Sequence, residues 1–297
     1  MAVGDVMLAQ TIGKRIKSNG LLAPWKGVVD YFDQADLVVA NLECTISTRG
    51  TPWPKVYTFR APPRAAASLA AAGMDVVSLA NNHALDYGVT AFEDTLDLLD
   101  RNGIRYAGGG RDEAEAHAPL IVERNGLRIA FLSYVHPFFS LPHFHTRQWA
   151  AGPDKPGLVV GTPEMVAREV AAVRPRVDAV VVTLHGGGEF YRGPTAKVHR
   201  YVDAALGAGA TLVIGHHPHV LQGYHYEART LVAYSLGNFV FDLHERRRAN
   251  ESVILDVTLS ARGVISVNWI PIVIENGFPR PARGSEIDHI MAQVPAL

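Results

Sequence analysis

The chain has 297 residues, of which 48% are hydrophobic and 19% are charged, and its formal net charge is -1. This composition can bury the core of one large α/β domain, and the balanced charge excludes a protein held on nucleic acid by a basic surface. The single cysteine, Cys44, excludes an intrachain disulfide. We find neither a membrane-span pattern nor a signal peptide, so we expect a cytoplasmic protein. The first strand begins so early that the natural start could lie upstream, with an anchor.

Three short apolar segments in the first third of the chain are predicted to be buried strands, and each runs into polar side chains. The segments are residues 2–8, 35–43 and 74–80. The polar side chains at their ends are Asp5, Glu43, Asn82, His83 and Asp86. Such residues also cap helices and form Asx turns, so each of them alone leaves the structural and the functional interpretation open.

Helices and further strands are predicted along the rest of the chain. Apolar residues at helical spacing predict helices near residues 64–72, 89–101, 166–173 and 198–206. Apolar runs predict strands at residues 104–107, 127–134, 178–184, 211–214 and 230–235, and two alternating segments predict an antiparallel pair at 252–259 and 264–274. We find no internal repeat or linker, so we expect residues 1–297 to form a single domain.

Residues 136–157 interrupt this regular pattern with aromatic, proline and histidine residues. A long irregular segment in a compact domain is often a functional lid or an insertion, and we expect one here. His143 and His145 form a His-x-His pair in this segment. No apolar strand precedes them, so a role facing the substrate is favoured over metal binding.

Two histidine motifs follow strands in the second half of the chain. His185 precedes three glycines, which allow the backbone to approach a ligand closely. His217 and His219 follow the strand at 211–214, and an extended backbone would direct both imidazoles to the same side. A solvated polar loop is the alternative interpretation of this stretch.

Together, these strand ends predict a metal centre. Parallel α/β sheets gather the carboxyl ends of their strands at one edge, so we expect the polar side chains and the histidines to converge. Carboxylates, an amide and imidazoles form a donor set that suits Mn, Fe or Zn, and the carboxylates could bridge two ions. The lack of cysteine ligands argues against a structural zinc site, so we expect a catalytic centre with one or two divalent ions.

Six motifs, in the same order, resemble a known family. They are GDVML, NLE, ANNHALDYG, HGGGEF, GHHPHVLQG and SLGNFVFD, and they run from residue 4 to residue 242. They are similar to those of the CapA (poly-γ-glutamate capsule synthesis, PgsA-like) family, which belongs to the calcineurin-like metallophosphoesterase superfamily. The resemblance implies an α/β/β/α sandwich, in which helices flank two mixed sheets and a di-metal site lies at the strand ends.

The resemblance also implies a role for each residue that matches a motif. The implied metal ligands are Asp5, Glu43, Asn82, His185, His217 and His219. Glu43 matches the bridging carboxylate. His83 matches the catalytic histidine, which would protonate a leaving group, and Asp86 is its expected partner in proton transfer.

Two departures from the superfamily pattern affect the expected chemistry. The first motif is normally Asp-x-His, but here it is Asp5-Val6-Met7. A thioether is a poor ligand for Mn²⁺ or Zn²⁺, so the first metal site lacks one ligand. The second motif is normally Gly-Asp-x-x-Asp, and here Glu43 alone takes its place. Two-metal phosphoester hydrolysis is therefore only one of the reactions to consider.

Three functions are consistent with the sequence. The first is a metal-dependent hydrolase that acts on a phosphoester or on a peptide or polyglutamate-related substrate. The second is a metal-dependent peptide epimerase, in which a Lewis acid activates a Cα–H group and His83 and Asp86 shuttle the proton. The third is a non-catalytic component of polyglutamate biosynthesis. All three involve a small-molecule or peptide partner rather than nucleic acid.

Overall fold

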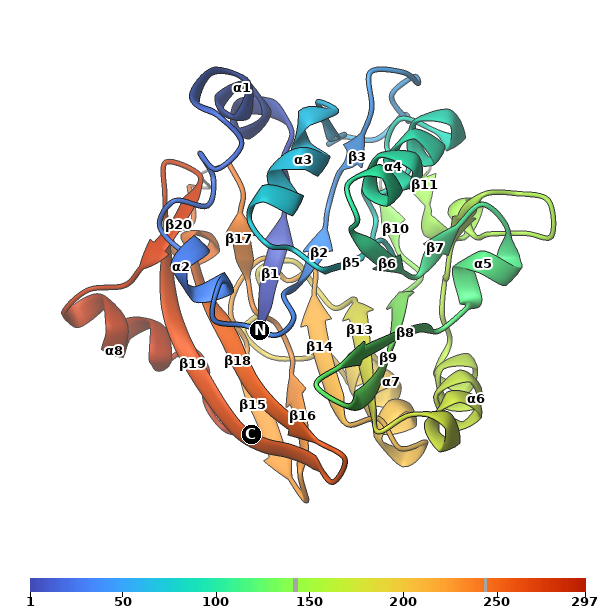
Figure 1. Ribbon diagram of the computed structural model, residues 1–297, viewed down its shortest axis with the longest axis vertical. Helices are drawn as coiled ribbons and strands as arrows, with labels where there is room; N and C mark the ends of the chain where they lie inside the picture. Colours follow the sequence, from blue (N-terminus) through green and yellow to red (C-terminus); the bar gives the residue numbers. More distant parts are fainter. Residues whose placement is uncertain (141–143, 243–244) are drawn as a thin grey trace.

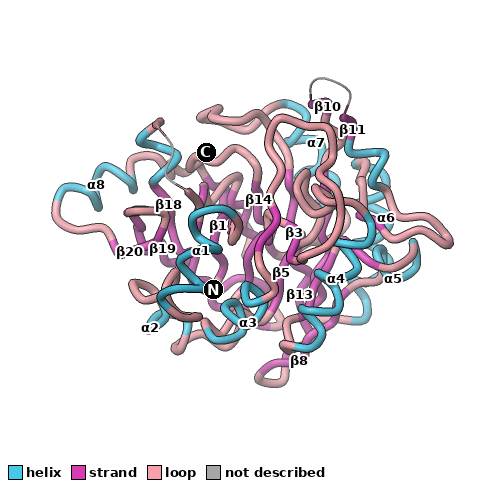
Figure 2. The backbone as a smooth tube through the Cα atoms, turned by 90° about the horizontal axis from the view of Figure 1, so that it is seen from above, coloured by secondary structure: helices cyan, strands magenta, loops and turns pink. Residues whose placement is uncertain are grey.

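The computed structural model describes residues 1–140, 144–242 and 245–297. These residues form two large mixed sheets, with strands at the centre and helices outside them (Figures 1 and 2). The first sheet has the order β20 (Phe278–Pro281), β19 (Gly263–Glu275), β18 (Glu251–Ser260), β1 (Ala2–Val6), β2 (Val39–Leu42), β5 (Val76–Ser78) and β6 (Arg105–Ala107). In addition, β17 (Asn238–Val240) pairs with β1.

The second sheet has the order β15 (Tyr224–Glu227), β16 (Thr230–Ala233), β14 (Leu212–His216), β13 (Ala179–His185), β9 (Leu127–Val135) and β8 (Leu120–Arg124). Its four inner strands are parallel, and its two edge strands are antiparallel to their neighbours. Three short pairs lie outside the large sheets: β3 (Thr45–Ile46) with β4 (Arg60–Ala61), β7 (Gly109–Gly110) with β12 (Gly157–Leu158), and β10 (Phe139–Ser140) with β11 (Phe144–His145).

Helices cover the outer face of each sheet, as the buried side chains show. The first sheet packs against α1 (Gln10–Asn19), α3 (Arg64–Ala71) and α4 (Val89–Arg101), and the second against α6 (Pro163–Val173) and α7 (Ala196–Gly207). The shorter helices are α2 (Val29–Phe32), α5 (Glu113–His117) and α8 (Ser285–Met291), with 3-10 turns at Thr146–Trp149, Arg174–Arg176 and Arg247–Asn250. The α/β/β/α sandwich expected from the sequence is therefore confirmed.

Strand β13 shows why these strands are continuous apolar runs. Val181 packs between the two sheets, whereas Val180 and Val182 pack against the helices on the outer face. Successive side chains in a strand point to opposite faces, so a strand covered on both faces needs apolar residues at every position.

The segment at residues 136–157 is more regular than its sequence suggests. Its described part contains β10, β11, the turn at Thr146–Trp149 and the start of β12. Phe144 and Trp149 are fully buried and contact each other, with ring centroids 4.4 Å apart, and both contact Trp53. This part of the segment is thus packed into the core. His143 lies outside the described residues.

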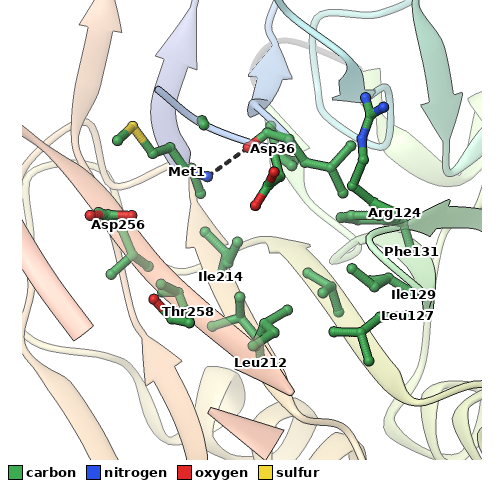
Figure 3. A pocket seen from close by; sticks show the side chains of 18 of the residues that line it. Met1, Asp36, Arg124, Leu127, Ile129, Phe131, Leu212, Ile214, Asp256 and Thr258 are labelled. Carbon is green, nitrogen blue, oxygen red and sulfur yellow. Dashed lines mark hydrogen bonds between the residues drawn. The ribbon is translucent and has the colours of Figure 1, made fainter. Parts of the chain in front are cut away.

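A cavity lies between the two sheets, beside the beginnings of β1, β9 and β14. Its volume is about 370 Å³, and Figure 3 shows Ile129, Phe131, Leu212 and Ile214 projecting into it, with Asp256 among the charged side chains around them. Of the described residues that line it, none belongs to the predicted metal centre. None of the described helices is long and apolar enough to cross a membrane.

Candidate metal centre

Polar side chains from both sheets meet at the carboxyl ends of the inner strands. Two glycines allow close packing of the strands that carry them. A Cβ atom on Gly4 would lie 2.0 Å from the carbonyl oxygen of Gly237, and one on Gly215 would lie 2.0 Å from that of Tyr234. Any larger residue would separate these strands, so Gly4, next to Asp5, and Gly215, next to His216, are needed for the convergence.

A buried network of amides positions the two carboxylates that were predicted to bind metal. The Asn41 Nδ2 atom donates hydrogen bonds to Asp5 Oδ1 (2.9 Å) and to Glu43 Oε2 (3.2 Å). The Asn81 Nδ2 atom donates in turn to Asn41 Oδ1 (3.0 Å), and Asn81 Oδ1 accepts the backbone N–H of His83 (2.9 Å). Neither asparagine was predicted to belong to the site, although Asn81 adjoins Asn82 and Asn41 lies two residues before Glu43.

The second carboxylate oxygen of Glu43 faces several imidazoles. Glu43 Oε1 is 3.8 Å from His185 Nε2, 3.8 Å from His219 Nε2 and 4.0 Å from His83 Nε2. It is buried and has no hydrogen-bond partner among the described residues. An unpaired buried carboxylate oxygen is costly, and a divalent cation between it and the imidazoles would compensate it. The donor atoms present therefore fit a divalent metal ion.

The other predicted ligands surround the same point. Asn82 Oδ1 lies 2.7 Å from His185 Nε2, so these two side chains converge from different sheets. Asp5 Oδ2 lies 3.3 Å from His219 Nδ1, which also contacts Asn238 Oδ1 at 2.8 Å. Asp5, Glu43 and His185 each offer a ligand atom within 4.8 Å of the other two.

The loop at His217 and His219 reaches the site by a different backbone path from the one predicted. Both residues have a positive φ, 97° and 58° respectively, so the expectation of an extended backbone is wrong. Sterically strained conformations of this kind are common at functional sites. The rings still lie near each other, with centroids 5.9 Å apart. His216, which precedes them, contacts Asp5 Oδ1 through Nδ1 at 3.1 Å.

Met7 does not act as a substitute ligand. Its side chain is fully buried in the core of the first sheet, and its sulfur accepts a hydrogen bond from the backbone N–H of Ala9 at 3.2 Å. The Met7 sulfur is thus engaged with the backbone of its own loop.

His83 and Asp86 form a buried pair at the edge of this cluster. His83 Nδ1 lies 2.7 Å from Asp86 Oδ2, and because a carboxylate only accepts, the ring donates through Nδ1. Nε2 is then the atom that faces Glu43. Lys55, which the sequence analysis missed, donates to Asp86 Oδ1 at 2.6 Å and to the carbonyl oxygen of Asn82.

The titratable groups of the site differ in what shifts their pKa values, and for three histidines the main cause is burial. Burial lowers the pKa of His185 and of His217 well below its ordinary value, and neighbouring imidazoles reinforce the effect. Burial also lowers the pKa of His83, to about 4, with a further contribution from the Lys55 ammonium. Neutral imidazole is the form that binds metal ions.

The remaining groups respond mainly to one another. Burial disfavours the charged form of His219, but the carboxylates of Glu43 and Asp5 outweigh it and raise its pKa to about 10. Burial alone would raise the pKa of Asp5, yet hydrogen bonds from His216 and His219 hold it well below its usual range. Burial and the nearby Asp5 raise the pKa of Glu43 well above its usual range.

Aromatic rings surround the cluster. The ring of Phe59 lies 4.4 Å from His83, that of Phe138 lies 4.2 Å from His217, and that of Phe241 lies 5.4 Å from His219, all between centroids. They keep the donor atoms in a region of low dielectric constant.

His145 accepts the backbone N–H of Arg147 through Nδ1 (2.9 Å), so this ring nitrogen caps the following turn.

The two large mixed sheets and the helices on their outer faces define the class of the fold, an α/β/β/α sandwich. A solved structure titled "putative 5'-nucleotidase from Staphylococcus aureus in complex with alpha-ketoglutarate" is similar to this chain, with a TM-score of 0.50 and 14% identity. The match covers 88% of this chain and 50% of the other. This likeness concerns the fold.

The family follows from the sequence comparison. The model of the family described as "bacterial capsule synthesis protein PGA_cap" matches residues 1–243, so the chain belongs to this family. The "capsule biosynthesis protein CapA" of Bacillus anthracis is 27% identical over 291 residues, covering 95% of this chain and 69% of the relative. The "PGA biosynthesis protein CapA" of Bacillus subtilis (strain 168) is 28% identical over 284 residues, covering 95% and 73%.

Proposed function

We propose that this protein is a metal-dependent hydrolase that takes part in the biosynthesis of a capsule or a related polyglutamate. The observation that carries the proposal is the buried, unpartnered oxygen of Glu43, which faces three imidazole nitrogens at 3.8 to 4.0 Å. The names of the two Bacillus relatives support the capsule role. The proposed substrate is a phosphoester or a peptide or polyglutamate-related molecule.

The residues that would hold the ions are the ones that surround Glu43. They are Asp5, Glu43, Asn82, His185, His217 and His219. The mixture of nitrogen and oxygen donors suits Mn²⁺ best, with Fe or Zn as alternatives. When bound, such ions supply Lewis-acid polarisation of a substrate oxygen and neutralise negative charge that develops on it.

The His83–Asp86 pair would move the proton. Asp86 fixes the ring of His83 through Nδ1, so Nε2 faces the reacting groups and would accept a proton there and return it to the leaving group. Lys55 keeps Asp86 in place from its other oxygen. The ring of Phe59 limits the access of water to His83 from one side.

The test is metal-stimulated cleavage of an aryl phosphodiester, followed by absorbance. We expect turnover with Mn²⁺, and we expect it to fall by about 10²-fold or more in His83→Ala. This is the lower end of the contribution that general acid–base catalysis typically makes to the rate. His225, which lies on β15 outside the cluster with its side chain 40% exposed, provides the control variant His225→Ala. No turnover with Mn²⁺, Fe²⁺ or Zn²⁺, on phosphodiesters or on γ-glutamyl peptides, would contradict hydrolysis and favour a non-catalytic role in polymer biosynthesis.

One observation favours the epimerase as a second candidate. With Nδ1 donating to Asp86, the Nε2 atom of His83 is arranged to take a proton from a substrate carbon, and no water-derived nucleophile is required. Incubation of peptides in deuterated water with Mn²⁺ tests this reaction by mass spectrometry. Incorporation of deuterium at a Cα position without cleavage would support it, and no exchange across a peptide panel would count against it.

A further inference from the structure

Glu189 lies next to the two histidines of the last motif, although it is an exposed residue. Its carboxylate, one ring nitrogen of His217 and one of His219 all lie within 4.8 Å of one another. Ligand atoms of Asp5, Glu43 and His185 also lie within 4.8 Å of one another. Two groups of three donors therefore lie around the site: a first group of Asp5, Glu43 and His185, and a second group of Glu189, His217 and His219.

Backbone hydrogen bonds fix the loop that carries Glu189. The N–H of Phe190 donates to the carbonyl oxygen of Pro218 at 2.8 Å, so the residue after Glu189 is attached to the residue between the two histidines. Phe190 has a positive φ of 64°. The side chain of Gln222 donates to the carbonyl oxygen of Tyr191 at 2.7 Å. The carboxylate therefore starts from a backbone held against the histidine loop.

The glycines before Glu189 permit this path. Gly187 has a φ of 114°, a conformation that side-chain-bearing residues rarely adopt. A Cβ atom on Gly188 would lie 2.8 Å from the ring of Tyr191. The run of glycines after His185 therefore brings Glu189 back over the site.

Two further observations indicate that a donor is needed here. The Nδ1 atom of His217 is buried and has no hydrogen-bond partner in the described part of the chain. A buried polar atom without a partner calls for a bound ion or another ligand. In addition, Met7 occupies the place where the superfamily motif has a histidine, and its sulfur is engaged with the backbone of Ala9.

We propose that the carboxylate of Glu189 supplies the ligand that the Asp-x-Met motif lacks. With His217 and His219 it would hold a second divalent ion beside the one held by Asp5, Glu43 and His185. This inference rests on the proposed metal-dependent function and adds a residue to its site. Carboxylate and imidazole donors suit Mn²⁺, as they do in the first group.

The exposure of Glu189 distinguishes the two ions. Asp5, Glu43 and His185 are all buried, so an ion among them is shielded from solvent. An ion that touches Glu189 faces solvent and the approaching substrate. The second ion is thus expected to exchange faster and to be removed first by a chelator.

Calorimetric titration with Mn²⁺, followed by elemental analysis of the desalted full chain, tests the assignment. The wild-type chain should bind two ions. In Glu189→Gln the affinity for the second ion should fall at least about tenfold, because this is the smallest loss typical of removing even an outer-shell partner of a metal ligand. Glu227→Gln, on an exposed strand far along the chain, is the control and should bind as the wild type does. Electron paramagnetic resonance should show coupled Mn²⁺ ions in the control and an uncoupled ion in Glu189→Gln.

Unchanged stoichiometry, affinity and spectrum in Glu189→Gln would overturn the assignment, whatever the effect on turnover. One ion in the wild type, retained in Glu189→Gln, would overturn it too, but would leave the proposed metal-dependent function standing. No ion in the wild type would overturn both.

Discussion

The contact between Lys55 and Asp86 shows how a single buried residue supports the site. The Lys55 side chain is only 3% exposed, and its ammonium lies 2.6 Å from Asp86 Oδ1. The same ammonium lies over the rings of Phe144 and Trp149, at 4.9 and 5.0 Å from their centroids. Lys55 therefore links the acid that orients His83 to the segment at residues 136–157.

Replacement of Lys55 by methionine should destabilise the protein strongly. Lys55→Met keeps the length of the side chain but leaves the Asp86 carboxylate buried without its cation, which typically costs about 3–5 kcal/mol. Urea unfolding gives the free energy, with the exposed Lys17→Met as the control. The double variant Lys55→Met/Asp86→Asn should lose less than the sum of the single variants. A loss below about 1 kcal/mol in Lys55→Met would show that the pair is not needed.

Metal affinity should depend on pH through His219. Its pKa of about 10 means that the metal-free chain holds a proton there at neutral pH, whereas a ligand must be deprotonated. The ion that His219 binds should then displace this proton, and the apparent affinity for that ion should rise by about tenfold per pH unit from pH 6.5 to 7.5. Calorimetry in two buffers of different protonation enthalpy measures this release. Binding that is independent of both pH and buffer would contradict it.

At this scale the sequence predicts residue types better than it predicts geometry. Asp5, Glu43 and the histidines could be selected because acids and imidazoles at strand ends are unusual unless they serve chemistry. Asn41 and Asn81 lie inside two of the motifs, but asparagine is common in turns, and the hydrogen bonds that join Asn41 to Asp5 and Asn81 to Asn41 link segments far apart in the sequence, so their role was not predicted. The positive φ values of His217 and His219 arise from tertiary contacts that strand periodicity does not encode.

At the scale of elements, the site depends on how closely neighbouring strands approach. Strand β14 carries Gly215 one residue before His216, and β13 ends at His185 in register with His216. The backbone of Tyr234 fills the space where a side chain on Gly215 would lie. The ends of these strands therefore hold their histidines in place only while the glycine is present.

Gly215→Ala should disturb both stability and metal binding. Its Cβ would lie 2.0 Å from the Tyr234 carbonyl oxygen, so the strands must separate, at an expected cost near the upper end of about 1–3 kcal/mol. Thermal and urea unfolding measure the loss, and Mn²⁺ titration should show weaker binding. Gly207→Ala, where a helical Cβ meets nothing within 4 Å, should be neutral or stabilising by up to about 1 kcal/mol. Equal stability of the two variants would contradict the account.

The elements with a sustained periodicity were predictable from sequence, whereas those without one were not. The antiparallel pair β18 and β19 appears where alternating residues predicted it, because its period of two is sustained over many residues. Helix α1 was missed because only Ile12, Gly13 and Ile16 are buried on it, which makes a weak apolar stripe. The pair β10 and β11 has two residues in each strand, too few for any periodicity to show.

At the scale of the whole molecule, the metal centre joins the two sheets. Asp5 and Glu43 belong to the first sheet and its loops, whereas His185 and the loop at His217 belong to the second. Ions held between these groups would add contacts across the sandwich that the unfolded chain does not make. A ligand that binds only the folded state stabilises it in proportion to the logarithm of its concentration over Kd.

Mn²⁺ should therefore raise the melting temperature of the chain. At a free concentration of 100 times Kd the expected stabilisation is about 2.7 kcal/mol, and a chelator should reverse it. Circular dichroism during heating measures the change, and Glu43→Gln should show a smaller rise than the wild type. Identical melting curves with Mn²⁺ and with chelator would contradict the proposed centre.

The most direct test of the central claim is the metal content of the chain after loading with Mn²⁺ and desalting, measured by elemental analysis with His217→Ala in parallel. The account predicts about two ions per chain in the wild type and fewer in the variant, because His217 contributes a buried donor with no other partner among the described residues. About one ion would leave Lewis-acid chemistry in place but would contradict the second site. No bound metal in the wild type would contradict the account.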